Sequence, residues 1–235
     1  FPAATLTDMT PKMLMGGLLS AVADYGEKLV LILDGAEKLT PAVAEQTLLV
    51  LLRYAPANLH IALAARSLQG LAMSWLMAQG QVNLIGVDTL KFTHEEQGEF
   101  ISIPLHKKSQ GIVSVQYAGW PVALQFLKNA MAGRRDHDKV IEAFDGARPE
   151  VREYISEQIL KPLTAEQRGF LLDVSMLANF DARSADYIRN DNNSRSVLAS
   201  LTELYPLLVP QQGGADSFAL LPAFRAALLA ILSQN

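Results

Sequence analysis

The sequence contains no cysteine, which excludes disulfide bonds and thiolate metal ligands. This composition fits a reducing compartment, so we expect a cytoplasmic protein. No apolar run reaches the ~18 residues that a membrane-spanning helix needs, and no signal peptide is apparent, so a membrane partner is not expected. The chain begins at Phe1 rather than Met, which indicates a processed or excised piece.

The sequence also lacks the phosphate-binding loop GxxxxGK[ST], because none of its glycines is followed by lysine. No Ser-His-Asp set and no GxSxG elbow occur. The histidines have no metal-ligand spacing, which favours structural or solvated roles for His60, His94, His106 and His137. A net charge of -4 argues against a dominant nucleic-acid surface. No catalytic residue is therefore assigned from motifs alone.

What is present is a pair of apolar runs, each ending in a charged residue. KLVLILDG (28–35) ends in Asp34, and LHIALAAR (59–66) ends in Arg66. A helix is predicted between them over 41–54, because Thr40 and Pro41 form an N-cap followed by a first-turn proline. The order strand, helix, strand predicts a parallel βαβ unit. The unbroken apolar strand over 29–33 predicts helices on both faces of the sheet.

Other elements are predicted around this unit. A helix over 11–25 leads into the first strand, and the stretch 67–81 is predicted to be helical and to end near Gly80. The short apolar run VNLIGV (82–87) predicts a third strand. The helix over 41–54 is expected to bury a stripe of Val43, Thr47, Val50 and Leu51.

Asp34 and Arg66 lie where an open α/β sheet binds its ligands, at the carboxyl ends of its strands. A carboxylate there suits Mg²⁺ held beside phosphates, although a strand-end Asp also caps ordinary turns. The planar donor fork of Arg66 suits a terminal phosphate, although a surface arginine at the start of a loop has the same pattern. The residues themselves leave both alternatives open.

The pattern changes to helices after Val87. Thr93 and Glu96 predict a capping box, and Pro121 with Gly133 marks the two ends of a further helix. Residues 140–160 are predicted to be helical around a break at Arg148-Pro149. The motif Gly119-Trp120-Pro121 has two interpretations, a proline and aromatic near an adenine base, or a helix start with a core Trp.

The last 75 or so residues resemble a winged-helix domain in outline. A capping box at Thr164 and Gln167 opens the first helix, and two helices follow within 181–204. Two short strands are predicted around Gly213-Gly214, a hairpin signal, and a final helix covers 222–232. The segment 181–204 contains three Arg against three Asp and one Glu, which is a poor electrostatic match to DNA phosphates.

In this order the segments resemble the MalT-like ATPases of LuxR-type transcriptional regulators, within the STAND class of NTPases. The resemblance covers nearly the whole chain, and LKFTHEE and GWPVALQ are its most telling parts. The segments are LVLILDGAEKLT, YAPANLHIALAAR, LMAQGQVNLIGVDTLKFTHEEQGEFI, AGWPVALQFL, YISEQILKPLTAEQRGFLLDVSML, LASLTELYPLLVPQQ and SFALLPAFRAALL.

The resemblance implies an α/β plus all-α fold in three domains. These are a partial P-loop NTPase unit with a parallel sheet (1–90), a helical domain (91–147) and a winged-helix domain (148–235). It also implies that Asp34 is the Walker B aspartate and metal ligand, and that Arg66 is the arginine after the next core strand. Gly119, Trp120 and Pro121 correspond to the Gly-x-Pro motif near the adenine.

The chain departs from this family pattern in several places. Gly35 stands where the family has a second acid, although Glu37 lies close by, so the pattern does not decide whether ATP is hydrolysed. Leu221 stands where the family often has a histidine that contacts the nucleotide. The P-loop and the LuxR-type helix-turn-helix are expected outside these residues. We therefore expect this chain alone to bind ATP weakly or not at all.

Three functional hypotheses follow. In the first, the chain is the ATP-responsive switch core of a regulator that uses ATP/ADP and Mg²⁺, self-associates, responds to an unidentified inducer and binds DNA through another domain. In the second, it is a degenerate, non-catalytic module that binds protein partners. In the third, the winged helix itself binds DNA.

Overall fold

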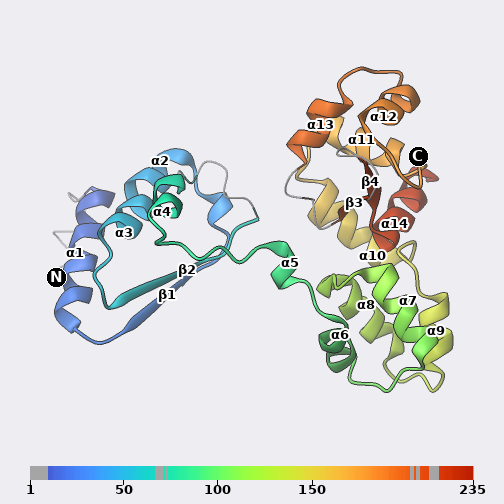
Figure 1. The fold of residues 1–235 in the computed structure, drawn as a ribbon, viewed down its shortest axis with the longest axis horizontal. Coiled ribbons are helices and arrows are strands. Elements are labelled where there is room, and N and C mark those ends of the chain that lie inside the picture. Colours follow the sequence, from blue (N-terminus) through green and yellow to red (C-terminus); the bar gives the residue numbers. More distant parts are fainter. Residues whose placement is uncertain are drawn as a thin grey trace. The chain divides into compact units, whose positions relative to one another are not determined.

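The chain folds as two units, Phe1–Leu84 and Ile85–Asn235 (Figure 1). The computed structural model describes residues 10–66, 71, 73–201, 204, 207–211 and 217–234. The first unit combines a parallel sheet with helices, and the second is mostly helical with a small hairpin. The predicted α/β plus all-α fold class is thereby confirmed. The division into three domains ending at 90 and 147 stays a prediction.

The first unit contains the predicted βαβ arrangement. Strands β1 and β2 pair in parallel, with Leu29 opposite Leu59 and Leu33 opposite Leu63. The predicted helix before β1 and the predicted helix between the strands are both present. The elements of this unit are α1 (Pro11–Tyr25), β1 (Leu29–Leu33), η2 (Ala36–Lys38), α2 (Pro41–Val43), η3 (Ala44–Leu48), α3 (Leu49–Tyr54), β2 (Leu59–Leu63) and α4 (Ser74–Ala78).

Helices cover only one face of this sheet in the part of the unit that is described. In Figure 1, α1 to α4 lie on one side of the β1–β2 pair. Both strands alternate between half-buried and exposed residues, and the side chains of Val30 and Ile32 are 60% and 74% exposed. The prediction that both faces are covered is therefore wrong for the described residues. An unbroken apolar strand does not reveal which of its faces its own chain covers.

The predicted third strand over 82–87 is also absent. Residues 81–86 have no regular structure, and the short helix α5 (Val87–Leu90) begins at the end of the predicted strand. The side chains of Leu84 and Ile85 are exposed. A strand needs a neighbour to accept and donate its backbone hydrogen bonds, and the described residues provide none for this segment.

The helix between the strands buries only part of the predicted stripe. Its middle segment η3 is π-helical. Leu51 is buried as predicted and Thr47 and Val50 are half-buried, whereas Val43 is exposed and the buried positions also include Ala44 and Leu48. The wider π turn rotates the side chains relative to an ideal 3.6-residue repeat. The predicted cap is nevertheless present, because Thr40 Oγ1 accepts a hydrogen bond from Val43 N at 3.4 Å.

The second unit begins with a series of helices whose ends match the sequence signals. Thr93 and Glu96 form a reciprocal capping box, and Gly133 lies just past the end of α8 with a φ of +71°. The predicted break at Arg148-Pro149 separates two helices. The elements are α5 (Val87–Leu90), α6 (His94–Ile101), α7 (Lys107–Tyr117), α8 (Pro121–Met131), α9 (His137–Ala143), α10 (Pro149–Tyr154) and η4 (Ile155–Leu160).

The rest of this unit has the predicted winged-helix order, three helices, a two-stranded hairpin and a last helix. Strands β3 and β4 are antiparallel, with Leu208 opposite Leu220. The predicted turn at Gly213-Gly214 lies outside the described residues. The elements are α11 (Ala165–Val174), α12 (Ala182–Arg189), α13 (Ser194–Ser200), β3 (Leu208–Pro210), β4 (Phe218–Leu220) and α14 (Pro222–Leu232).

One hydrophobic core runs through the second unit. It includes Leu124 and Leu127 from α8 as well as Phe170 from α11 and Phe224 from α14, all fully buried. Each such side chain contributes roughly 1.5–3 kcal/mol through removal from water. None of the helices in the described part of the chain is long and apolar enough to cross a bilayer.

Candidate functional site

The candidate site in the first unit is the carboxyl edge of the β1–β2 sheet. Because the strands are parallel and in register, both end at this edge. Asp34 directly follows β1, and Arg66 lies three residues beyond Leu63, the last residue of β2. Both side chains are exposed. The structure thus brings the two predicted charged residues to the same edge of the sheet, as the sequence pattern requires.

A tight turn after β1 adds a second carboxylate to this edge. Gly35 has a φ of +71°, a left-handed conformation that favours glycine, and Ala36 N then donates to Ala64 O at 3.1 Å. The following residue, Glu37, accepts a hydrogen bond from the backbone N of Arg66 at 3.3 Å. The sequence places Glu37 close to Asp34 along the chain, but the contact of Glu37 with the loop after β2 depends on the pairing of the strands and has no local signal.

The residues at this edge could hold Mg²⁺ only together with ligands from a bound nucleotide. Within the described ranges there is no group of three or more His, Asp or Glu side chains that could hold a metal ion. A magnesium ion is, however, commonly held by one or two carboxylates together with the phosphates of a nucleotide. The exposed carboxylate of Asp34 satisfies that requirement, so a metal here would need a phosphate ligand.

The motif Gly119-Trp120-Pro121 forms the turn between α7 and α8 in the second unit. Gly119 has a φ of +76°, and a Cβ atom there would lie 2.4 Å from Phe92 O. The Gly119 carbonyl accepts a hydrogen bond from Phe92 N at 3.1 Å. Trp120 is half-buried and packs against Tyr154, with ring centroids 6.5 Å apart. Pro121 is the first residue of α8.

These contacts give the motif a clear structural role at the start of a helix. They leave its predicted role near an adenine base as a prediction, since Gly119 belongs to one unit and Asp34 to the other. Leu221, which replaces the family's histidine, is 1% exposed and donates its backbone N–H to Leu207 O at 2.8 Å. Leu221 is therefore a core residue.

Arg189, one of the three arginines in the segment 181–204, is not available to DNA phosphates. Arg189 is 9% exposed and forms ion pairs with Asp173 at 3.5 Å and with Asp191 at 3.4 Å. Its guanidinium also lies 5.3 Å from the ring of Phe170. An arginine held this way stabilises the helices and presents little of its charge to solvent. This further weakens the electrostatic match to DNA that the composition of 181–204 already disfavours.

Two of the four histidines make polar side-chain contacts, and their structural or solvated role stays a prediction. His94 Nδ1 lies 2.6 Å from Ser114 Oγ, and His106 Nε2 lies 3.5 Å from Asp138 Oδ2. No histidine among residues 10–66, 73–201 and the other described positions belongs to a metal-binding group.

The fold resembles that of a Walker-type ATPase. A solved structure of a Walker-type ATPase from Pyrococcus abyssi superposes with a TM-score of 0.56 and 15% sequence identity, covering 95% of this chain and 69% of the other. This likeness concerns the fold alone.

The sequence comparisons point to MalT-like proteins. Residues 156–235 match the family model of the MalT winged helix domain. The HTH-type transcriptional regulator MalT of Serratia proteamaculans is 24% identical over 196 residues, 80% of this chain and 22% of its own length. The corresponding protein of Klebsiella pneumoniae is 23% identical over 219 residues, 90% of this chain and 24% of its own length. The resemblance to MalT-like regulators is confirmed, and the chain spans about a quarter of these relatives.

Proposed function

We propose that this chain is the nucleotide-responsive core of a MalT-like transcriptional regulator. The proposal rests on one observation: Asp34, Glu37 and Arg66 all lie at the carboxyl edge of a parallel strand pair. This is the edge at which open α/β sheets bind their ligands. The relatives, whose name describes them as HTH-type transcriptional regulators, support the regulatory part of the proposal.

The residues have distinct proposed roles. Asp34 would orient Mg²⁺, which when bound neutralises charge on the phosphates. Arg66 would contact the terminal phosphate through its exposed guanidinium, since the hydrogen bond to Glu37 engages only its backbone N–H. Gly119, Trp120 and Pro121 would line the adenine side. A phosphate-binding loop is not among these 235 residues and would have to come from elsewhere in the protein.

The output of the switch is proposed by analogy with the relatives. Nucleotide and inducer together would favour self-association, and DNA would be bound by a helix-turn-helix domain outside this chain. We place this regulator in the cytoplasm, where its nucleotide and DNA ligands are found. The ion pairs of Arg189 with Asp173 and Asp191, and the acidic Asp186 of α12, disfavour DNA contact through the winged-helix segment itself.

Replacing Asp34 tests the nucleotide site. In the complete gene product that contains these residues, Asp34→Ala should lower the Mg²⁺-dependent affinity for ATP about tenfold or more, because a charge-assisted ligand to the metal is lost. Isothermal titration calorimetry with ATP, with and without Mg²⁺, measures this. Asp24→Ala is the matched control, since Asp24 is an exposed acid on α1 of the same unit. An Asp34→Ala protein with unchanged Mg²⁺ dependence would refute the proposed role.

The second candidate is a protein-interaction module that keeps the fold without nucleotide chemistry. It is favoured by Gly35 and by the burial of Leu221, and the exposed side chains of Val30 and Ile32 offer an apolar surface. Under this hypothesis the complete protein binds no ATP in the same calorimetric experiment. Micromolar, Mg²⁺-dependent binding that Asp34→Ala abolishes would rule this candidate out.

A further inference from the structure

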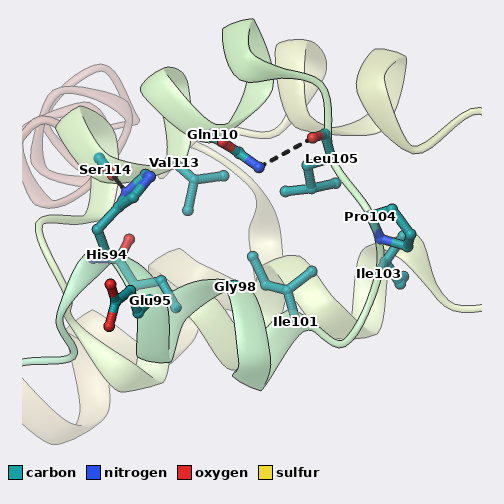
Figure 2. A pocket seen from close by; sticks show the side chains of 11 residues that line it. His94, Glu95, Gly98, Ile101, Ile103, Pro104, Leu105, Gln110, Val113 and Ser114 are labelled. Atoms are coloured by element: carbon teal, nitrogen blue, oxygen red, sulfur yellow. Dashed lines mark hydrogen bonds between the residues drawn. The ribbon is translucent and has the colours of Figure 1, made fainter.

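The second unit contains hollows of contrasting chemistry. Figure 2 shows a small one, of about 260 Å³, between α6 and α7, where Ile101, Leu105 and Val113 line the space. No lysine or arginine is among the described residues that line it. A larger hollow, of about 830 Å³, lies between the end of α8, the α9 helix and the start of α10. We call it the α8–α9 hollow, and its size falls within the ~300–1,000 Å³ of typical ligand sites.

The lining of the α8–α9 hollow carries an excess of positive charge. Four cationic side chains stand against two acidic ones, in a chain whose net charge is -4. The set consists of Arg134, Arg135, Lys139 and Arg148 with Asp136 and Glu150. Lys139 Nζ lies 3.0 Å from Asp136, and Arg148 Nε lies 2.7 Å from Glu150. The two acids are thus used by two of the cations, and two arginines are left over.

These two arginines are followed by acids in the sequence RRDHDK (134–139), but the fold gives the acids other partners. Asp136 caps α9 and accepts a hydrogen bond from Lys139 N at 3.1 Å. Asp138 accepts a hydrogen bond from Ser109 Oγ on α7 and is not part of the lining. In the part of the chain that the structure describes, neither arginine has an ion pair or a side-chain hydrogen bond. Both are exposed, so their charge is available to a ligand.

Much of the remaining lining is apolar. It includes Phe126 and Ala130 from α8 and Val140 and Ala143 from α9. Phe126 and Val140 are half-buried and pack against the hydrophobic core of the unit, which fixes their positions. Apolar surface beside unpaired cations favours a ligand that carries both aliphatic and anionic groups.

The distribution of the cations favours an extended ligand. The unpaired arginines lie in the connection between α8 and α9, Lys139 lies in α9, and Arg148 directly precedes α10. One compact anion reaches only part of such a set, whereas a chain with several carboxylates can reach all of it. The bases of a single-stranded nucleic acid need an open aromatic face. Phe126, the one aromatic residue in the described lining, instead packs against Tyr154, with ring centroids 5.9 Å apart.

We propose that the α8–α9 hollow binds an acidic peptide segment of a partner protein, with an aliphatic side chain as its anchor. Carboxylates of the segment pair with Arg134 and Arg135, and the anchor contacts Val140 and Ala143. Because the charges lie at the surface, the contact is weak and sensitive to salt.

The probe is the peptide acetyl-EELEE-amide, titrated into the whole 235-residue chain and followed by amide shifts in ¹⁵N NMR spectra. We expect saturable shifts in 134–143 that weaken when NaCl is raised from about 0.05 M to about 0.5 M, since exposed charges are screened. Absence of saturable binding would overturn the site.

Three further probes test the ligand class. The neutral peptide acetyl-QQLQQ-amide should not bind, and acetyl-EESEE-amide, which lacks the aliphatic anchor, should bind about threefold more weakly or less. A single-stranded hexathymidylate should bind more weakly than acetyl-EELEE-amide. Equal binding of the neutral peptide, equal binding of the peptide without the anchor, or tighter binding of the oligonucleotide would overturn the assignment to an acidic peptide.

A pair of double variants connects binding to the two unpaired arginines. Arg134→Gln with Arg135→Gln should lower the affinity for acetyl-EELEE-amide about fivefold or more, the effect of losing two exposed ion pairs. Lys107→Gln with Lys161→Gln removes the same charge from exposed positions outside the hollow and should change the affinity less than about twofold. Equal effects of the two double variants would mean that only the net charge matters, and the proposal would fail.

A second pair adds a charge instead of removing one. Ala143→Glu places a carboxylate in the lining and should weaken binding about threefold or more, because like charges repel. Ala165→Glu adds the same charge at the exposed start of α11, outside the hollow, and should have little effect. All the substituted side chains are exposed, and circular dichroism establishes that each variant is folded. Binding that survives Ala143→Glu unchanged would place the peptide elsewhere.

Sedimentation velocity on the chain without peptide tests a second copy as the occupant. We expect the distribution to be the same for the unmodified chain and for the variant with Arg134→Gln and Arg135→Gln. A dimer that this variant disperses would assign the hollow to self-association and overturn the proposed partner. No nucleotide enters these experiments, so their results are independent of the proposed ATP switch.

Discussion

At the scale of single residues, Gly119 is a position where both the backbone conformation and a close neighbour restrict the side chain. Its positive φ costs an L-residue about 1–2 kcal/mol, and a Cβ would meet Phe92 O at 2.4 Å. We expect Gly119→Ala to lower the free energy of unfolding by about 2–4 kcal/mol, because the clash is with backbone and no rotamer relieves it. Urea unfolding followed by circular dichroism measures this.

Gly111→Ala is the matched control for that prediction. Gly111 lies inside α7, and a Cβ at this position would meet nothing within 4 Å. Alanine there should leave stability unchanged or raise it by up to ~1 kcal/mol through helix propensity. If Gly119→Ala and Gly111→Ala had the same stability, the close contact between the α7–α8 turn and Phe92 would not exist in solution.

At the scale of one element, α12 depends on its N-cap. Asp181 accepts hydrogen bonds from Ser184 N and Ser184 Oγ, both at 2.7 Å. These bonds, the backbone one first, hold the pKa of Asp181 below its ordinary value. A lowered pKa in the folded state means that the cap stabilises the protein above the unfolded-state pKa of about 3.9. That contribution is lost as the pH falls through the folded-state pKa.

Asp181→Ala should therefore lower the free energy of unfolding by about 1 kcal/mol at pH 7. The difference from the unmodified chain should shrink once the pH is well below 4. Urea titrations at several pH values measure both effects. Asp181→Asn keeps a capping oxygen without a titrating group, so it should retain most of the stability and lose the pH dependence. A difference that grows on acidification would contradict this account of the cap.

At the scale of the whole second unit, Gly146 joins the helices before residue 148 to the winged-helix segment. A Cβ at Gly146 would lie 1.6 Å from Ala223 O in the first turn of α14. Gly146→Ala must displace one backbone segment from the other. We expect it to lower the free energy of unfolding by about 3 kcal/mol or more, at the upper end of overpacking effects. Scanning calorimetry on the chain measures the corresponding decrease in the unfolding temperature.

Gly169→Ala on α11 is the control, because a Cβ there meets nothing within 4 Å. If Gly146→Ala were as harmless as Gly169→Ala, the two parts of the unit would be less closely packed than described.

The hydrophobic core is continuous across residue 148, with Leu124 before it and Phe224 after it. This continuity predicts that Ile85–Asn235 unfolds in one cooperative transition.

Local signals predicted most of the elements of this protein. The capping boxes at Thr93 and Thr164 and the proline at the start of α8 are present as expected. Such signals work because the bonds they describe join residues three positions apart. The carboxyl-edge site was predicted in part for a similar reason, since parallel pairing alone brings Asp34 and Arg66 to one edge.

The predictions that were wrong depended on distant parts of the chain. Whether 82–87 forms a strand depends on a partner for its backbone, and whether Val30 and Ile32 are covered depends on a second layer. The contact of Glu37 with Arg66 N likewise depends on the strand register. None of these conditions is encoded within a window of neighbouring residues.

The sequence by itself determined where most of the helices begin and end, where the two parallel strands lie and which charged residues follow them, because caps, turns and apolar periodicity act over a few residues. Only the tertiary structure decided that Gly119 and Gly146 must lack side chains, that Arg189 is buried among acids, and that Asp138 binds to α7 instead of to the nearby Arg135. These properties arise where segments far apart in the chain come within van der Waals distance, and packing at that distance has no local signature.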